Sequence, residues 1–189
     1  MVFLGIHTNP DKTFTVANMD ENRNIRFISN FWKEGLLWFL DHANADIIAV
    51  NISPWFDSIQ VKNAYEVVSA LKEIFGFEEP GVKPTEKVVL KTDADMFFSQ
   101  LVRKELLPIT TREGIEQRIY NLPKAGIMVK PELFSKEKKR LQKEVISIAT
   151  AFAAYSIHHG TYSVEEKDGE QFYIPRYQFV PRDQRIISR

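Results

Sequence analysis

Short apolar runs separated by polar turn residues fill the first part of the chain, and this pattern predicts strands. The runs are Met1–His7, Thr13–Ala17 and Asn24–Ser29, and the residues between them include Thr, Asn, Asp and Pro. Connections this short cannot carry a parallel crossover, so the three runs predict an antiparallel meander. Its first strand ends at His7, at the edge where open sheets collect their ligands.

A helix and a buried strand follow the meander. In Phe31–Asn44 the apolar side chains recur at helical spacing, and Asn30 is the expected N-cap. The continuous apolar run Ile47–Val50 is typical of a strand that is buried on both faces. A right-handed crossover through the helix would lay this strand parallel to the first one. We therefore expect Asn51 to end beside His7.

The middle of the chain predicts two more helices and further strands. Apolar residues at helical spacing mark Ile59–Phe75 and Asp93–Leu106 as helices. Val88–Leu90 is apolar but only three residues long, and it could form a short strand. Ile115–Leu122 alternates imperfectly between apolar and polar positions, and it is our prediction for the fifth strand of the sheet.

The final helix has the strongest pattern in the chain. Ser135 is its expected N-cap, Lys136–Lys143 forms a charged first half, and Val145–Ile157 is almost wholly apolar or small. Small side chains permit close approach, so this half of the helix suits packing across the centre of a sheet. Thr161–Ile174 then predicts a hairpin, because Lys167–Gly169 is a tight-turn sequence between two short strand-like runs.

Length and composition narrow the class of protein. A chain of 189 residues with 44% hydrophobic residues fits one globular domain, which we place at residues 1–174, followed by an Arg-rich tail at residues 175–189. Basic and acidic residues are equal at 25 each, so any polyanion site must be a local patch. The chain has no cysteine, which excludes disulfides and cysteine zinc sites. With no signal-like N-terminus and no long apolar stretch, we expect a soluble, cytoplasmic protein.

The order of these elements resembles the ribonuclease H-like fold, and four short stretches are similar to one branch of it. Gly5–His7 stands where that branch has Gly-Ile-Asp, and Asn51–Pro54 where it has Ile-Asp-x-Pro. Tyr120–Pro123 is similar to its Glu-x-Tyr-Pro stretch, and Thr150–Ala154 to its Asp-Ala-x-Ala-Ala. The branch is the predicted-nuclease family of domains of unknown function (number 429). This resemblance implies an α/β fold in which a mixed five-stranded sheet, three antiparallel strands and then parallel ones, is flanked by helices.

The departures from that family bear on its chemistry. Nucleases of this fold hold two divalent cations with carboxylates, and Mg²⁺ prefers charged oxygen ligands. The family-equivalent positions here are His7, Asn51 and Thr150, which supply no formal negative charge. We therefore expect no metal or other cofactor and a catalytically degenerate binding or structural module. Nucleic acid is the partner that the fold suggests.

An alternative is an active metal-dependent nuclease or phosphoryl hydrolase with displaced acids. Asp57, Asp93 and Glu116 could hold Mg²⁺ or Mn²⁺ if they reached the sheet edge, and Asp11 and Asp95 lie in similar segments. The ordinary interpretation is that these acids are surface, capping or turn residues, which are common places for them.

Three further features leave alternatives open. His7 with His158 or His159 could make a partial zinc site, although a histidine in the last turn of a helix also suits the helix dipole. Trp55 follows the buried strand and is either packed at its edge or available to stack on a base. The tail or the C-terminal hairpin could instead bind another protein, and the oligomeric state stays open. The tail arginines are Arg176, Arg182, Arg185 and Arg189.

Overall fold

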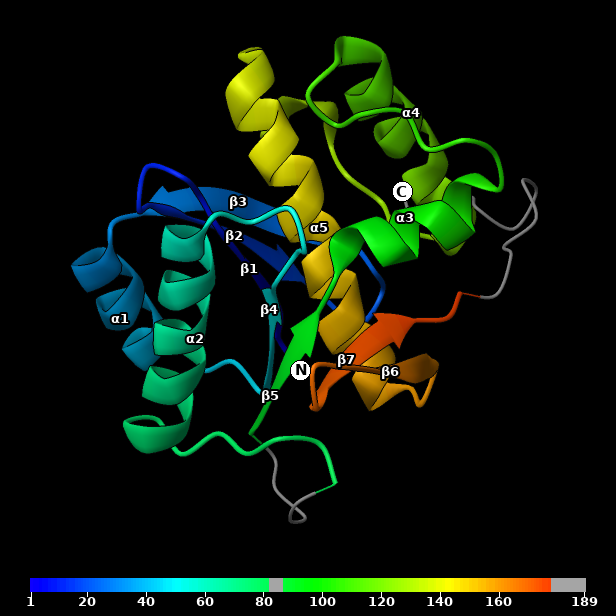
Figure 1. Ribbon diagram of the computed structural model, residues 1–189. Coiled ribbons are helices and arrows are strands. Elements are labelled where there is room, and N and C mark those ends of the chain that lie inside the picture. Colours follow the sequence, from blue (N-terminus) through cyan, green and yellow to red (C-terminus); the bar gives the residue numbers. More distant parts are fainter. Residues whose placement is uncertain (82–86, 178–189) are drawn as a thin grey trace.

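A mixed five-stranded sheet with helices on both faces forms the centre of the molecule (Figure 1). The computed structural model describes residues 1–81 and 87–177. The strand order is β3-β2-β1-β4-β5, and the sheet strands are β1 (Phe3–Thr8), β2 (Phe14–Met19), β3 (Ile25–Phe31), β4 (Ile47–Asn51) and β5 (Val88–Thr92). The first three strands are antiparallel, and β4 and β5 run parallel to β1. The meander and the parallel crossover predicted from the sequence are confirmed.

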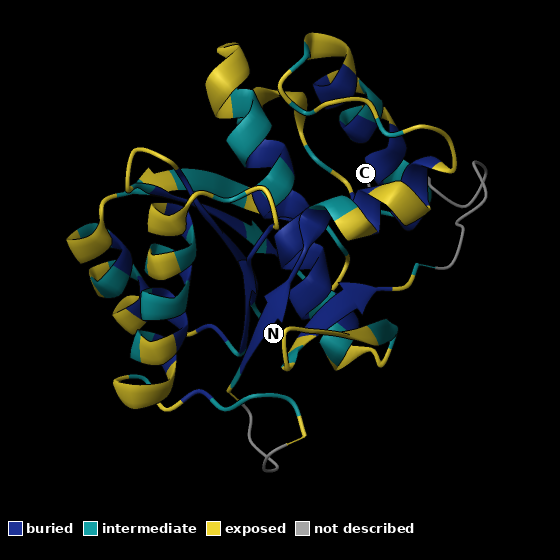
Figure 2. Ribbon diagram, in the orientation of Figure 1, coloured by how far each residue is buried: buried dark blue, intermediate teal, exposed yellow. Residues whose placement is uncertain are grey.

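Two helical layers cover the sheet. The helices α1 (Lys33–His42) and α2 (Ser58–Glu73) lie on one face, where Leu4 and Ile6 of β1 join their core. The other face is covered by α3 (Ala94–Val102), α4 (Arg112–Asn121) and α5 (Lys138–His158). Figure 2 shows β1, β2, β4 and β5 mostly in dark blue, while α1 and α2 carry exposed residues on their outer sides. The sheet is therefore buried on both faces, as a parallel centre requires.

The close approach of α5 to β1 depends on Gly5. A Cβ atom on this glycine would lie 2.1 Å from the backbone nitrogen of Ala151 and 2.4 Å from the carbonyl oxygen of Ser147. The helix backbone thus rests on the backbone of the central strand, which only small residues on both elements allow. This confirms the prediction that the small-residue half of the last helix lies across the middle of the sheet.

The predicted C-terminal hairpin forms a separate two-stranded sheet. Its strands are β6 (Tyr162–Lys167) and β7 (Glu170–Pro175), and β7 packs beside β5 and α5. Phe172 and Ile174 of β7 are buried in the core on the α2 side of the sheet. Short 3-10 helices at Leu122–Ala125 and Pro131–Leu133 connect α4 to α5.

The prediction of a fifth strand at Ile115–Leu122 is wrong, because this stretch lies in α4 and the 3-10 helix after it. Its buried residues include Ile115, Arg118 and Leu122, at a spacing of three and four, which is the period of a helix. The helical period was not recognised in the sequence because one of its buried positions is occupied by a charged residue, Arg118. The fifth strand is β5, which extends the short run Val88–Leu90 to Thr92.

Two helix starts also differ from the sequence predictions. Ser135 does not cap α5, which begins after Glu137; the Ser135 hydroxyl accepts from the backbone nitrogen of Glu137 in the preceding turn. Asn30 does not cap α1, because it is the penultimate residue of β3. Within the described residues, none of the helices is both long enough and apolar enough to pass through a bilayer.

Candidate functional site

A row of neutral polar residues crosses the whole sheet at the C-terminal ends of its parallel strands. Each strand contributes one residue, and successive residues are direct cross-strand partners. Cross-strand partners point to the same face of a sheet. Since Gly5 faces α5, His7 two positions later does as well. We call this set the polar row: Asn30, Thr15, His7, Asn51 and Thr92.

Asn51 holds the middle of the polar row in place. Its side-chain oxygen accepts a hydrogen bond from the backbone nitrogen of Ala94 at 2.9 Å, at the start of α3. Its Nδ2 lies 3.3 Å from Nδ1 of His7. Because the amide oxygen already faces a donor, Nδ2 donates to His7 and Nδ1 accepts. The proton of the neutral imidazole is therefore on Nε2.

His7 is buried, and its surroundings keep it neutral. It is 4% exposed, and the ring of Phe56 lies over it at 5.5 Å between centroids. Burial lowers the pKa of His7 to about 3, and the positive charge of Lys143 contributes to this, while Asp11 acts in the opposite direction. Lys143 of α5 and Asp11 of the β1–β2 turn form an ion pair at 2.9 Å. A cation thus lies at the sheet edge where His7 and Asn51 stand as cross-strand partners.

The two ends of the polar row differ in how well they are bonded. On the β2 side, Thr15 donates to Asn30 at 2.7 Å and accepts from Asn9 at 3.0 Å. On the β5 side, the hydroxyl of Thr92 is buried and has no hydrogen-bond partner among the described residues. Neither threonine was predicted as a site residue, because the short apolar run Val88–Leu90 stops before Thr92 and Thr15 has the pattern of an ordinary strand residue.

Of the three family-equivalent positions, the structure brings His7 and Asn51 together. Thr150 is fully buried, and its hydroxyl donates to the carbonyl oxygen of Ile146 in its own helix. Its backbone lies against Gly5. The helix runs antiparallel to β1, since Phe3 contacts Tyr155 near one end, while Lys143 approaches His7 near the other. Thr150 is therefore level with Gly5, and Lys143 is the residue of α5 that acts on His7.

The displaced acids lie at separate helices. Asp57 is the N-cap of α2 and forms a capping box with Gln60. Asp93 is the N-cap of α3 and accepts from the backbone nitrogen of Asp95; burial raises the pKa of its carboxyl group. Glu116 is exposed on α4 and pairs with Arg112 at 2.8 Å. Capping and surface pairing account for all three positions.

Divalent metal does not fit the donor set of the polar row. The amide oxygen of Asn51 is already used, Nδ1 of His7 accepts a hydrogen bond, and Lys143 adds a positive charge beside them. Mg²⁺ and Mn²⁺ prefer charged oxygen ligands. Across residues 1–81 and 87–177, no group of three or more His, Cys, Asp or Glu is placed to hold a metal ion. His158 contacts Phe3, at the opposite end of β1 from His7, so the structure separates the two.

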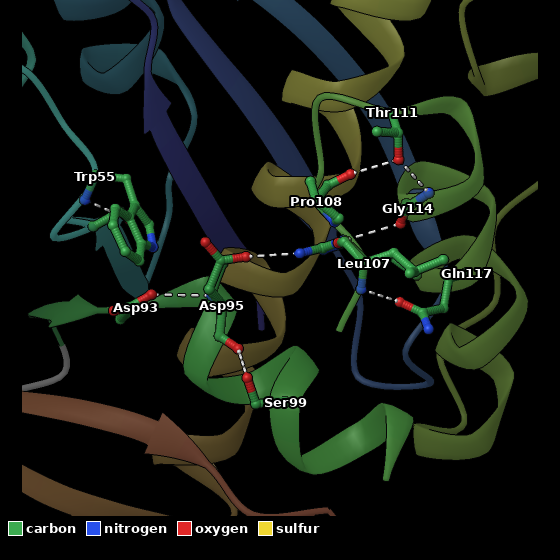
Figure 3. Close-up of polar contacts among 12 residues, drawn as sticks. Trp55, Asp93, Asp95, Ser99, Leu107, Pro108, Thr111, Gly114 and Gln117 are labelled. Atoms are coloured by element: carbon green, nitrogen blue, oxygen red, sulfur yellow. Dashed lines mark hydrogen bonds and ion pairs between the residues drawn. The ribbon is translucent and has the colours of Figure 1, made fainter. Parts of the chain in front are cut away.

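A charged cluster adjoins the same sheet edge (Figure 3). Asp95 at the start of α3 accepts from the buried guanidinium of Arg118 at 3.1 Å, and Arg118 also donates to the carbonyl oxygens of Leu107 and Gly114. Burial lowers the pKa of Arg118, and the charge of Asp95 opposes that effect. Trp55, just beyond β4, is 82% exposed at this edge. It is the most exposed of the large apolar side chains in the described chain.

Comparison with known proteins identifies the fold. No protein-family model and no curated protein sequence matches the chain. Among solved structures, RuvC of T. thermophilus, in complex with a Holliday junction substrate, is similar with a TM-score of 0.50 and 15% identity. The match covers 85% of this chain and 97% of that one. The chain therefore has a ribonuclease H-like fold, and the fold class expected from its sequence is confirmed.

Proposed function

We propose that this protein is a ribonuclease H-like domain that binds nucleic acid without metal-dependent cleavage, and that it is a degenerate relative of the predicted-nuclease family. The observation that carries the proposal is the polar row, in which Asn51 bonds to both His7 and Ala94 beside a lysine ammonium. Two-metal catalysis needs several carboxylates around a shared point. Here Lys143 of α5 adds a positive charge at this end of β1, which repels cations.

Exposed cationic and aromatic groups near the strand ends support nucleic acid as the partner. Lys139 is exposed one helical turn before Lys143, and Lys12 is exposed at the β1–β2 turn. Trp55 presents a stacking surface at the end of β4. The net charge of the chain is zero, so a local patch of this kind is the form that a polyanion site would take here. The similar RuvC structure contains a nucleic-acid junction.

The division into a domain at residues 1–174 and a tail at residues 175–189 belongs to the same proposal. Arg176 is described, whereas Arg182, Arg185 and Arg189 lie outside the described residues. We propose that these arginines add sequence-independent phosphate contacts to the domain.

Fluorescence anisotropy with labelled single-stranded DNA, duplex DNA and an RNA–DNA hybrid tests the binding. We expect the same affinity in EDTA as in Mg²⁺ or Mn²⁺, and intact substrates after incubation. Trp55→Ala should weaken binding by about 1–3 kcal/mol if a base stacks on the indole. Trp38→Ala is the matched control, because Trp38 is also exposed, at 66%, but lies on α1.

Calorimetric titration with Mg²⁺ and Mn²⁺ completes the test, and we expect no saturable binding at the polar row. Metal-dependent cleavage that is abolished by His7→Ala would refute the proposal. Cleavage abolished instead by Asp57→Asn, Asp93→Asn or Glu116→Gln would establish the displaced-acid hydrolase. Failure to bind any of the three nucleic acids would exclude the nucleic-acid role and favour a protein-binding module.

A further inference from the structure

One nitrogen of the polar row has a hydrogen to donate, and no acceptor for it lies among the described residues. Nδ1 of His7 accepts from Asn51, so the ring proton is on Nε2. Among the described residues the bond to Asn51 is the only hydrogen bond of this ring. Nε2 is not one of the buried atoms that lack a partner in the described chain, so this donor reaches water at the small exposed part of the ring. His7 is 4% exposed, and an acceptor atom can approach Nε2 from that exposed side.

The charge beside His7 selects the kind of acceptor. The Lys143 ammonium lies at the same end of β1, because it pairs at 2.9 Å with Asp11 in the turn that follows this strand, and its side chain is 21% exposed. An ammonium and a ring N–H attract an anion and repel a metal ion. A phosphate oxygen accepts from both kinds of donor.

The carboxylate of Asp11 is an anion within the chain that already pairs with Lys143. Partial burial of Asp11 raises the pKa of its carboxyl group. Hydrogen bonds from Thr13 and Lys143 have the larger combined effect, so the pKa lies below its usual value. The carboxylate is thus ionised at neutral pH, and one of its oxygens lies 2.9 Å from Nζ of Lys143. The Asp11 side chain is 56% exposed on a surface turn, so it can turn away toward water.

We propose that the end of β1 binds a phosphate oxygen directly, through Nε2–H of His7 and the ammonium of Lys143, and that Asp11 competes for the same lysine. The anion takes the place at which nucleases of this fold hold cations. This inference rests on the proposed function and names its ligand chemistry as a phosphodiester group of the nucleic acid. Asp11 sets the affinity, because an incoming phosphate must displace its carboxylate from Lys143.

Charge-neutralising substitutions at the two partners test the proposal with opposite expected signs. Asp11→Asn should raise the affinity for a fluorescein-labelled single-stranded oligonucleotide by about three- to five-fold, as the loss of one exposed charge pair implies. Lys143→Gln should lower it by at least about ten-fold, because a charge-assisted hydrogen bond is lost. Lys143→Gln should also reduce the slope of log affinity against log salt by about one. Lys143→Arg should restore both values.

Glu66→Gln is the matched control for the change of charge. Glu66 pairs with Lys33 between α1 and α2, on the other face of the sheet, and its loss should leave the affinity unchanged. Circular dichroism of each variant verifies that it is folded. If Asp11→Asn and Lys143→Gln both behave like Glu66→Gln, the proposed phosphate site is wrong.

Inorganic phosphate separates the possible sources of the ligand. Its titration is followed by ¹⁵N NMR of His7, where we expect the Nε2–H resonance to move and the effect to be larger in Asp11→Asn. A response to inorganic phosphate without any oligonucleotide binding would identify free phosphate as the ligand; it would refute the nucleic-acid function and the phosphodiester ligand, and leave the anion site itself standing. Oligonucleotide binding that is indifferent to residues 11 and 143 would refute the phosphate site and leave the proposed function standing.

Discussion

Asn51 and His7 form a hydrogen bond across the two central parallel strands, with 3.3 Å between Nδ2 and Nδ1. The same amide accepts from the backbone of Ala94, so one neutral side chain joins β1, β4 and the start of α3. A carboxylate at position 51 could accept from Ala94 equally well but could not donate to the ring. The neutral amide therefore fixes the tautomer and the orientation of His7, whose neutral state is due mainly to burial.

Asn51→Asp should raise the pKa of His7 by more than about one unit. An aspartate would accept from a protonated Nδ1 and attract the positive charge, which favours the imidazolium. NMR titration of the His7 ring measures the change. Asn30→Asp is the control, because Asn30 lies two strands away from His7 in the polar row and should shift this pKa much less. An unchanged value in Asn51→Asp would contradict the assigned hydrogen bond.

The stability of the protein should fall on mild acidification because His7 is held neutral. The pKa is lowered from 6.5 to about 3 by burial, so between these values the unfolded chain binds the proton and the folded chain does not. Stability due to this residue is present above pH 6.5 and is lost as the pH falls toward 3. From pH 7.5 to pH 5.5 the loss is about 1.4 kcal/mol. Urea unfolding at pH 7.5 and pH 5.5 should show this loss of stability in the wild type, and His7→Gln should lack it.

Gly5→Ala should strongly destabilise the fold, while Gly35→Ala should not. At Gly5 the new methyl group would meet backbone atoms of α5 at 2.1 Å and 2.4 Å, which neither element can relieve by a side-chain movement. Overpacking of this kind costs at least about 1–3 kcal/mol. At Gly35, in α1, the nearest atom is a ring carbon of Phe31 at 3.8 Å, and alanine is the better helix former. Thermal denaturation of the two variants gives the comparison; equal melting temperatures would contradict the packing described.

Local patterns in the sequence predicted the sheet because short loops and crossover handedness leave few topologies. The short connections between the first three strands require antiparallel neighbours, and a helix before an apolar run requires a parallel one. These rules placed Asn51 beside His7, and the register confirms it. The same reasoning failed at Ile115–Leu122, since hydrophobic periodicity treats every arginine as exposed and Arg118 is 2% exposed.

The surroundings of His7 were not predictable from the sequence, because they depend on contacts between distant segments. Lys143 reaches Asp11 because α5 lies across the sheet in close contact with Gly5. Read in isolation, Lys143 belonged to a charged helix face with neighbouring acids. The replacement of acids at positions 7 and 51 could be read from the resemblance, whereas the cation beside them required the three-dimensional structure.

Arg118 and Asp95 form a partly buried ion pair whose disruption should be costly. The Arg118 side chain is 3% exposed, and its guanidinium lies 3.1 Å from Asp95. The Nε atom of Arg118 has no hydrogen-bond partner among the described residues. Asp95→Ala would leave this charge with two carbonyl acceptors and the ring of Phe98 but without an anion, and breaking a buried pair costs about 3–5 kcal/mol. Because the Asp95 side chain is 29% exposed, we expect a loss of stability at the lower end of that range.

Glu116→Ala provides the comparison for this last prediction, because Glu116 pairs with Arg112 on the outer surface of the same region. Exposed pairs on a helix contribute little, since water screens the charges and two long side chains must be ordered. Urea denaturation should therefore show a large loss for Asp95→Ala and almost none for Glu116→Ala. Arg118→Met should lose less than Asp95→Ala, because an apolar side chain of similar length leaves no unpaired charge in the core. If Asp95→Ala proves as stable as Glu116→Ala, Arg118 reaches solvent and the ion pair between α3 and α4 does not hold these helices together.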